Sequence, residues 1–311
     1  MKIAVVCPYA IDEPGGVQQQ AIGLVEEIRA IGHEAWLVAP GTMGPSETRL
    51  IGRSVRVRAN GSIAPIALNP AAVGKTRRAV RGADVVHIHE PLMVLTSPAA
   101  YLGTDAPAVG TFHADPSTRV RAFYRLAGPA LRMVFSRLQA VTAVSEAAAS
   151  AVSHLVGELS LIPNAIDVGA FALQGERHPN RVVFLGRDEP RKGLDVLLAA
   201  WTLVRAAVND AELVVLGADR GGRDKGIRYM GTTVGLEKRR QLAQAGIYCA
   251  PNLGGESFGV TLLEGMAAGC APVVSDLEPF RQVAGSLARY AAVADPQSLA
   301  NQLIEALRDR R

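Results

Sequence analysis

The sequence predicts an α/β protein made of two successive doubly wound domains, each with a parallel sheet covered by helices. Apolar runs of strand length alternate with amphipathic stretches along the chain. Hydrophobic residues make up 49% of the chain but aromatic residues only 5%, a balance typical of parallel sheets on alanine-rich helices. The periodicity fades around residues 163–180, where Pro, Asn and Gly gather. We therefore expect domains at 1–165 and 181–311, joined by a linker at 166–180.

The first half begins with an apolar run at residues 2–7, which is predicted to be a strand. A turn with Gly15 and Gly16 follows, and an amphipathic helix is expected over residues 17–31, stopping at Gly32. Further strands are predicted at 34–39, 55–58, 84–89, 107–113 and 139–144. Helical segments separate most of these runs, which favours a parallel sheet.

The second half restarts the same alternation. Strands are predicted at 181–186, 212–217, 227–231, 246–251 and 271–275, with a helix from Gly193. Ligands of doubly wound sheets bind outside the carboxyl ends of the strands. The loops that follow the strands are therefore where we expect the functional residues.

The cysteines and the apolar segments limit the class of protein. Cys7, Cys249 and Cys270 lie far apart in apolar surroundings, which predicts reduced core residues and no zinc site. The first ten residues are expected to form a strand and not a signal peptide. No apolar stretch approaches the roughly 20 residues that a helix needs to span a bilayer. We expect a soluble, cytoplasmic protein.

Positive charge is concentrated in the first half of the chain. The formal net charge is +4, with a pI near 9.1. Residues 49–81 contain no acidic side chain, and their basic residues are Arg49, Arg53, Arg56, Arg58, Lys75, Arg77, Arg78 and Arg81. A second acid-free stretch carries Arg119, Arg121, Arg125, Arg132 and Arg137. A one-sided basic surface predicts an anionic partner.

A pair of glutamates gives the most specific signal. The loop GGESFG at 254–259 precedes an apolar run that is predicted to be a helix. If this helix starts after Glu256, that carboxylate stands in the loop, while Glu264 projects from the second or third turn. Both could then address one elongated ligand. An unpaired carboxylate in an apolar helix is costly, which disfavours a merely solvated Glu264.

Two glycine-containing loops suggest anion binding. In FLGRDEPRKG at 184–193, Arg187 and Lys192 lie in a strand-to-helix loop, and fixed cations with helix N–H groups suit a diphosphate. The alternative is a surface charge cluster, although cations at a helix N-terminus oppose its dipole. Gly15 and Gly16 precede a helix in the same way, but a tight turn explains them equally well.

Together these motifs resemble retaining glycosyltransferases of family 4, which have the GT-B fold of two Rossmann-like domains facing across a cleft. The E-x7-E spacing in GGESFGVTLLE, the segment FLGRDEPRKG and the first glycine loop carry this resemblance. The strings NGSIAP, VVHIHEP, TFH, IPNAIDV and CAPNLGGESFG are similar to those of actinobacterial phosphatidylinositol mannosyltransferases. The resemblance runs from residue 1 to about residue 283.

The resemblance implies a role for each matching residue. Gly15 and Gly16 would approach the donor diphosphate, and Arg187 and Lys192 would neutralise the leaving group. Glu256 would hold hydroxyls of the transferred sugar, Glu264 those of the ribose, and His113 would contact the sugar near the reacting carbon. The implied donor site also includes Gly186, Ser257, Phe258 and Gly259, and the implied acceptor residues are Tyr9, Gln18 and Asn60. Without the family, a satisfied interior imidazole is the favoured interpretation of His113.

The resemblance also implies the substrates: mannose from GDP-mannose, passed with retention to a phosphatidylinositol-type lipid. No D-x-D pair occurs, so a divalent metal is not expected, and the resemblance implies no cofactor. In a predicted helix at 70–82, Arg77, Arg78 and Arg81 share one face, with Lys75 nearby. These residues would hold the protein peripherally at the anionic inner face of the plasma membrane. A solvated basic helix is the alternative, and nucleic acid is disfavoured because aromatic residues are not interleaved with the charges.

Three features depart from the family pattern. The loop after TFH reads Ala114 to Arg119 and lacks the polar run of relatives. Residues 217–231 are expected to contain no helix, and the sequence ends at LIEALRDRR without the terminal crossover helix that relatives carry. Two other functions therefore remain open: transfer to a soluble acceptor such as a sugar phosphate or small glycoside, and binding of a nucleotide-sugar or an anionic surface without turnover.

Overall fold

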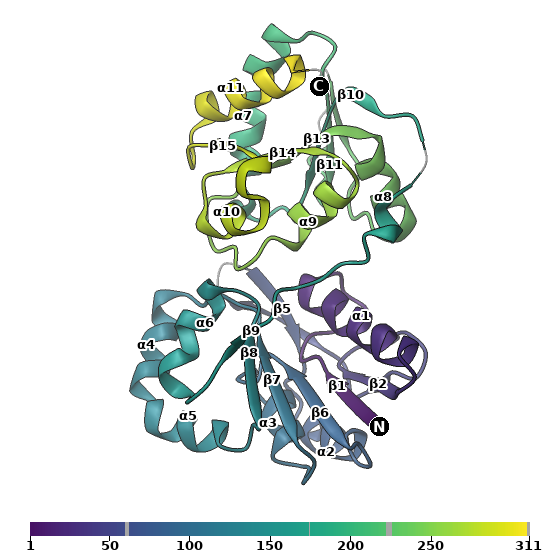
Figure 1. The fold of residues 1–311 in the computed structure, drawn as a ribbon, viewed down its shortest axis with the longest axis vertical. Coiled ribbons are helices and arrows are strands. Elements are labelled where there is room, and N and C mark those ends of the chain that lie inside the picture. The colour runs from purple at the N-terminus through teal and green to yellow at the C-terminus, as the bar shows by residue number, and fades with distance from the viewer. Residues whose placement is uncertain (60–61, 174, 222–225, 310–311) are drawn as a thin grey trace. The chain divides into compact units, whose positions relative to one another are not determined.

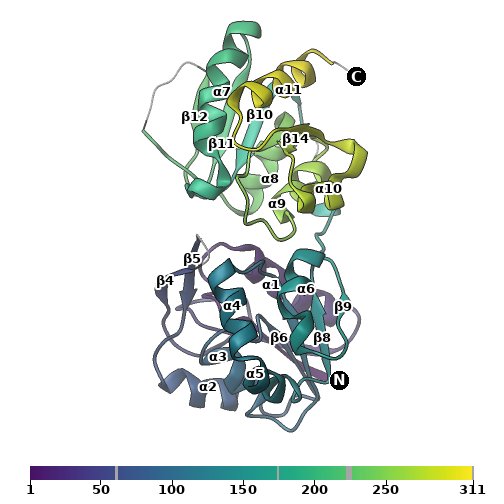
Figure 2. The same ribbon diagram turned by 90° about the vertical axis from the view of Figure 1, so that its left-hand side faces the viewer.

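The computed structural model describes residues 1–59, 62–173, 175–221 and 226–309. The chain separates into two compact units, Met1–Ala165 and Ile166–Arg311, and each carries its own parallel sheet (Figures 1 and 2). The predicted fold class, α/β with two Rossmann-like parallel-sheet units, is confirmed. None of the helices in the described chain is both long and apolar enough to cross a bilayer.

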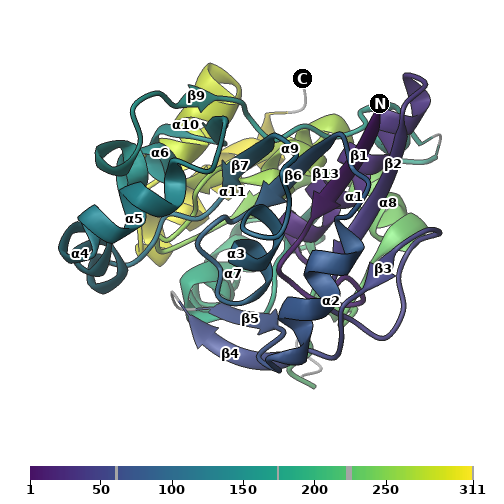
Figure 3. The same cartoon turned by 90° about the horizontal axis from the view of Figure 1, so that it is seen from below.

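The first unit is built on a seven-stranded parallel sheet with the order β3-β2-β1-β6-β7-β8-β9 (Figure 3). Its strands are β1 (Lys2–Val6), β2 (Glu34–Ala39), β3 (Arg49–Leu50), β6 (Val85–His89), β7 (Ala108–Phe112), β8 (Ala140–Ala143) and β9 (Ser160–Leu161). Its helices are α1 (Gly16–Ala30), α2 (Ala71–Ala79), α3 (Thr96–Tyr101), α4 (Thr118–Leu126), α5 (Gly128–Phe135) and α6 (Glu146–Val152).

The side chains of β2 show how this sheet is covered on both faces. Ala35 and Leu37 pack with Ala21 and Val25 of α1, so that helix covers one face. Trp36 points to the other face because side chains alternate along a strand. Its indole Nε1 donates to the carbonyl oxygen of Ala79 at the end of α2, at 2.9 Å.

Two predicted elements of this unit differ in the structure. The strand predicted at 55–58 is β4 (Val55–Ala59), which pairs antiparallel with β5 (Ser62–Ile66) in a hairpin outside the parallel sheet. Its alternation of valine and arginine suits a ribbon with one solvated face. The helix predicted over 70–82 ends at Ala79, because Gly82 turns the chain with a φ of +80°, so Arg81 lies beyond the helix.

The second unit is built on a six-stranded parallel sheet with the order β12-β11-β10-β13-β14-β15. Its strands are β10 (His178–Leu185), β11 (Glu212–Leu216), β12 (Ile227–Tyr229), β13 (Ala245–Ala250), β14 (Ala271–Ser275) and β15 (Arg289–Ala291). Its α-helices are α7 (Leu194–Ala207), α8 (Gly235–Gln244), α9 (Val260–Ala267), α10 (Glu278–Ala284) and α11 (Pro296–Arg308). No helix lies in the described part of 217–231, as expected.

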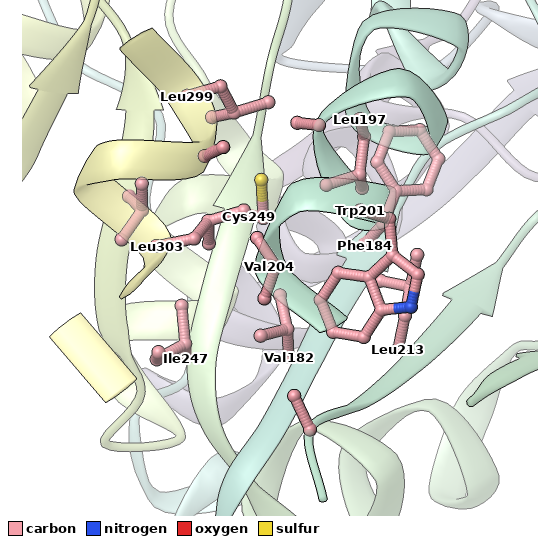
Figure 4. Packing of buried hydrophobic residues seen from close by; sticks show 14 of the residues in the cluster. Val182, Phe184, Leu197, Trp201, Val204, Leu213, Ile247, Cys249, Leu299 and Leu303 are labelled. Carbon is pink, nitrogen blue, oxygen red and sulfur yellow. The ribbon is translucent and has the colours of Figure 1, made fainter. Parts of the chain in front are cut away.

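The core of the second unit lies on both faces of this sheet. Figure 4 shows one face, where Trp201 of α7 and Leu303 of α11 pack on Phe184 of β10 and its neighbouring strands. The helices α8, α9 and α10 cover the other face. The predicted buried, reduced state of the cysteines is confirmed, because Cys7, Cys249 and Cys270 are all free and buried.

The described residues of the stretch 166–180, expected to be a linker, belong to the second unit. Ile166, Ala170 and Phe171 pack against its core, and Phe171 lies in a short 3-10 helix, η2 (Gly169–Phe171). Strand β10 begins at His178, three residues before the predicted start at 181. The apolar side chains in this stretch explain the difference, since exposing them in a free linker would be unfavourable.

Candidate functional site

The loop after β10 is fitted closely against the loop after β13. Residues 190–192 form a short 3-10 helix, η3 (Pro190–Lys192), and Gly193 follows in the left-handed region with a φ of +70°. A Cβ atom on Gly193 would overlap the carbonyl oxygen of Pro251. Glycine is therefore required at 193 for both the backbone conformation and the close approach, which brings loops 186–193 and 251–259 together.

Lys192 and Glu256 meet where these two loops touch. The Lys192 ammonium lies 2.7 Å from Glu256 Oε2, and Asn252 Nδ2 donates to the same oxygen at 2.8 Å. The side chains are only 13% and 15% exposed. Burial alone would raise the pKa of Glu256, but the Lys192 ammonium, together with Arg191 and a main-chain hydrogen bond from Gly259, holds that pKa below its usual range. The Glu256 carboxyl is therefore ionised at neutral pH.

Two further cations accompany Lys192. The carboxylate of Glu189 is paired with Arg187 at 3.1 Å and with Arg191 at 3.0 Å. Arg187, Arg191 and Lys192 thus share their ion pairs with only two carboxylates, while Asp188 of the same loop is paired with Arg220. Such an arrangement favours an anionic ligand. Arg191 was not among the predicted residues, because its position beside Lys192 in the sequence does not show that it bonds back to Glu189.

Glu264 stands in the second turn of α9, as predicted, and it is held by a lysine that the sequence analysis missed. Lys238 of α8 places its Nζ 2.6 Å from Glu264 Oε1, with both side chains less than 10% exposed. Among the described residues, Glu264 Oε2 is buried and has no hydrogen-bond partner. A buried acceptor of this kind is costly unless a ligand supplies a donor. The vicinal hydroxyls of a ribose have the chemistry to do so.

The remaining predicted donor residues complete the two loops. Gly259 caps α9 with a φ of +99°, and a Cβ there would come within 3.1 Å of Phe280. Ser257 and Phe258 precede it and are half-buried. The N–H of Gly186 donates to the carbonyl oxygen of Leu216 at 2.9 Å, which fixes the start of the loop 186–193 against β11.

In the first unit, His113 follows β7 and is 8% exposed. Its ring Nε2 lies 2.7 Å from Nδ1 of His89, and it forms a side-chain hydrogen bond with Asn164. Burial lowers the pKa of His113 to about 3, so the imidazole is neutral at physiological pH. These contacts are those of a satisfied interior imidazole, and a contact with the donor sugar stays a prediction.

Glu90 lies directly after β6 and was not among the predicted site residues. Its Oε1 accepts hydrogen bonds from the main-chain N–H groups of His113 and Ala114, each at 2.8 Å. Burial raises the pKa of Glu90 to about 7. The string VVHIHEP places a carboxylate at a strand end, but only the folded sheet shows that it reaches the next strand.

The first glycine loop leads into α1, whose first turn contains no acidic residue. A Cβ on Gly15 would overlap the Gln18 side chain, whereas the space beside Gly16 is open. A helix N-terminus of this kind suits an anion. Contact of these glycines with a diphosphate stays a prediction.

The predicted acceptor residues lie near the same loop. Gln18 is 6% exposed, and its Nε2 donates to the carbonyl oxygens of Ala10 and Glu13, so its amide supports the loop. The main chain of Tyr9 forms an isolated antiparallel β-bridge with Ile66. Asn60 lies outside the described residues. None of these observations tests a role toward the acceptor.

The predicted membrane residues are exposed. Lys75, Arg77 and Arg78 project from α2 into solvent, while Ala72 and Thr76 are buried beneath them. Arg81 is also exposed, beyond the end of the helix. No large apolar side chain of α2 is exposed, so any attraction of this helix to a membrane would rest on charge.

The sequence matches two family models in succession. The family model "Glycosyltransferase Family 4" matches residues 14–170, and the model "Glycosyl transferases group 1" matches residues 179–309. In the part of the chain that the structure describes, no group of three His, Cys, Asp or Glu residues could hold a metal ion.

Similar proteins agree with these matches. A phosphatidyl-myo-inositol mannosyltransferase from Mycolicibacterium smegmatis is 37% identical, with 99% of this chain and 85% of the relative covered. A GDP-mannose:cellobiosyl-diphosphopolyprenol alpha-mannosyltransferase from Xanthomonas campestris is 29% identical, with 66% and 59% covered. The solved structure of Anabaena HepE with UDP and glucose superposes with a TM-score of 0.75 at 15% identity, covering 99% of this chain and 90% of that one. Two family models match in succession, and a relative is 37% identical over 99% of this chain. The chain therefore belongs to glycosyltransferase family 4 and is a hexosyltransferase.

Proposed function

We propose that this enzyme transfers mannose from GDP-mannose, with retention of configuration, to the inositol of a phosphatidylinositol-type lipid. The observation that supports a nucleotide-sugar donor is the Lys192–Glu256 ion pair, which lies beside Arg187 and Arg191. The lipid acceptor and the mannosyl group are suggested by the name of the M. smegmatis relative, and GDP by that of the X. campestris relative.

The chemistry follows from the charges that develop during transfer. Breaking the sugar–phosphate bond puts positive charge on the sugar and negative charge on the leaving diphosphate. Arg187 and Lys192 would stabilise that diphosphate, because fixed cations at a developing charge lower the barrier without reorganisation. They would take the place of a divalent metal. We assign the leaving group to these two residues and propose that the reaction needs no metal ion.

The carboxylates would orient the donor. We propose that Glu256 binds hydroxyls of the transferred sugar, since it stays ionised beside Lys192. Glu264 would bind the ribose through Oε2, the buried oxygen without a partner among the described residues. His113 would contact the transferred sugar as a neutral imidazole, able to donate or accept a hydrogen bond but not to carry charge.

We propose that the enzyme works as a cytoplasmic protein peripherally bound to the inner face of the plasma membrane. The exposed Lys75, Arg77, Arg78 and Arg81 support this location, because basic residues near an anionic bilayer each contribute about 1 kcal/mol. A soluble phosphorylated acceptor is the second candidate. It is favoured by one observation, the lack of exposed large apolar side chains on α2.

A radiolabel transfer assay separates these functions. GDP-mannose and UDP-glucose are each offered with phosphatidylinositol in anionic vesicles and, in parallel, with soluble inositol phosphate. We expect label in the lipid with GDP-mannose alone. Label in a soluble product alone would keep the donor site but reject the lipid acceptor, and label from UDP-glucose alone would reject the proposed donor. Glu256→Ala and Lys192→Ala should each abolish most transfer, and Arg240→Ala, an exposed residue of α8, is the matched control.

A further inference from the structure

The last residue of β6 and the residue after it both hold His113, which follows the neighbouring strand β7. The His89 ring contacts the His113 ring through a 2.7 Å hydrogen bond. The Glu90 carboxyl accepts hydrogen bonds from the main-chain N–H groups of His113 and Ala114. The main chain of Glu90 is itself anchored, because its N–H donates to the carbonyl oxygen of Thr111 at 2.8 Å. The side chain and the main chain of His113 are thus both fixed from one strand end.

Glu90 occupies an unfavourable position. Its φ is +51°, in the left-handed region that residues other than glycine seldom adopt. Its side chain is buried, with 7% of the residue exposed, and no Lys or Arg of the described chain forms an ion pair with it. Strained backbone and a buried carboxyl without a cation are both costly, and such costs gather at functional sites.

A purely structural role explains this position poorly. A glutamine side chain would have the same length and could accept both main-chain hydrogen bonds without a charge. Burial raises the pKa of Glu90, so ionising this carboxyl destabilises the folded state. An acid that lowers stability where an amide would serve indicates that the negative charge itself has a use.

We propose that Glu90 is a positioning residue for sugar transfer, whose carboxylate holds the main chain at His113 and Ala114 and thereby the place of the His113 ring. This inference rests on the role proposed for His113 in the previous section. A carboxylate forms stronger hydrogen bonds to N–H groups than a neutral acid does. Protonation of Glu90 would therefore loosen the start of the loop that follows β7.

The groups around Glu90 allow its ionisation to be observed separately. They come from the end of β1, from α4 and from the neighbouring strands, and they are Cys7, Tyr9, Tyr124, His87, His89 and His113. Burial raises the pKa of the Cys7 thiol and that of Tyr124 to about 12. It also raises the pKa of Tyr9 well above its usual value. It lowers the pKa of His87 to about 4, that of His113 to about 3 and that of His89 well below its usual value. Within this cluster, Glu90 is the group that titrates between pH 6 and 8.

The kinetic test is the pH profile of kcat for wild type, Glu90→Gln and the control Glu158→Gln, an exposed glutamate of the same unit. A carboxyl with a pKa near 7 is about 90% ionised at pH 8 and about 10% at pH 6. We expect wild-type kcat to fall about tenfold over that range. The kcat of Glu90→Gln should be low and independent of pH, close to the wild-type kcat at pH 6. Its KM for GDP-mannose should stay within about twofold of the wild-type KM. A Glu90→Gln profile that keeps the wild-type acid limb and kcat overturns the proposal.

A second test does not depend on turnover. Hydrogen–deuterium exchange of the segment 111–117 is compared at pH 8 among wild type, Glu90→Gln, Glu90→Ala and Glu158→Gln. We expect faster exchange in Glu90→Ala, a smaller increase in Glu90→Gln, and none in the control, at protein concentrations where circular dichroism shows all four folded. Unchanged exchange in Glu90→Ala overturns the inference. If wild type transfers no sugar to any acceptor, the proposed function fails, and the exchange result alone still decides whether Glu90 holds the His113 main chain.

Discussion

Lys192 and Glu256 are 64 residues apart in the sequence, yet their charges meet at 2.7 Å between two loops of the second unit. Each is the main counter-charge of the other in a partly buried place. Removing one partner of such a pair leaves the other charged and desolvated, which costs more than the pair itself contributes. The two residues should therefore be tested as a unit, and their single substitutions should not be additive.

Lys192→Ala should lower kcat by roughly 100-fold or more, because it removes the fixed cation that we propose for the leaving diphosphate. Lys192→Arg keeps the charge and should lose much less. The measurement is steady-state transfer with GDP-mannose, with unfolding followed by circular dichroism to show that the variants are folded. Retention of more than half of the wild-type kcat in Lys192→Ala would rule out its assignment to the leaving group.

Gly193→Ala should destabilise the second unit by about 2–4 kcal/mol, because a Cβ atom there overlaps the Pro251 carbonyl oxygen and φ is positive. Gly231→Ala is the matched control, since Gly231 also has a positive φ, of +58°, but open space around its Cβ position. Urea unfolding measures the free energy of unfolding of both variants. Equal losses in the two would show that backbone strain, and not the contact with Pro251, makes glycine necessary.

Lys238→Met should weaken GDP binding by about tenfold, because the carboxylate of Glu264 loses its buried partner and is no longer held toward a ribose. Isothermal titration calorimetry with GDP and with 2′,3′-dideoxy-GDP measures the effect. The dideoxy analogue should bind wild type weakly, and its affinity should be nearly the same for Lys238→Met. An equal loss of affinity for both nucleotides would argue that Lys238 does not act through the ribose hydroxyls.

Arg77→Ser with Arg78→Ser should weaken binding to anionic vesicles by about 30-fold, since each exposed arginine contributes about 1 kcal/mol near such a surface. Vesicle flotation at several salt concentrations measures this, and the salt dependence should become shallower. Arg240→Ser, on α8 of the second unit, is the control for loss of an exposed charge. Equal binding of wild type to neutral and anionic vesicles would contradict the electrostatic role of α2.

Glu90→Gln should stabilise the protein at pH 8 and have little effect at pH 5. The pKa of Glu90 rises from an unfolded value near 4.5 to about 7 in the folded state, so its stabilising contribution is complete below pH 4.5 and is lost as the pH rises through 7. The gain at pH 8 is at most about 3 kcal/mol. Thermal unfolding at the two pH values measures it. Together with the kinetic test, this predicts a variant that is more stable and less active at the same pH.

The sequence predicted the parallel sheets well, because strands such as β1 and β10 contain short apolar runs, at 3–6 and 182–185. It did not show that β4 belongs to a hairpin. The alternation of valine and arginine at 55–58 has the same period in parallel and antiparallel pairs, so it carries no information on the partner strand.

The positions of the candidate residues in loops and helices were predictable where a short sequence motif contains them. Arg187, Lys192, Glu256 and Glu264 stand in the expected loops and helix. Lys238 was missed because it lies in the charged run EKRR, which is typical of a solvated helix face. Glu90 was missed because its partners are main-chain N–H groups, which every residue has and no sequence pattern marks.

The tight fit of Gly193 against Pro251 also bears on where loop lengths can change among relatives. Neither the loop at 186–193 nor the loop at 251–259 can gain or lose a residue near this contact without displacing the other. Gly231 and Gly235, at the edges of the segment between β12 and α8, meet no such obstruction, because nothing lies near their Cβ positions. Natural variation and directed evolution should therefore change the length of that segment more readily than the lengths of the loops at 186–193 and 251–259.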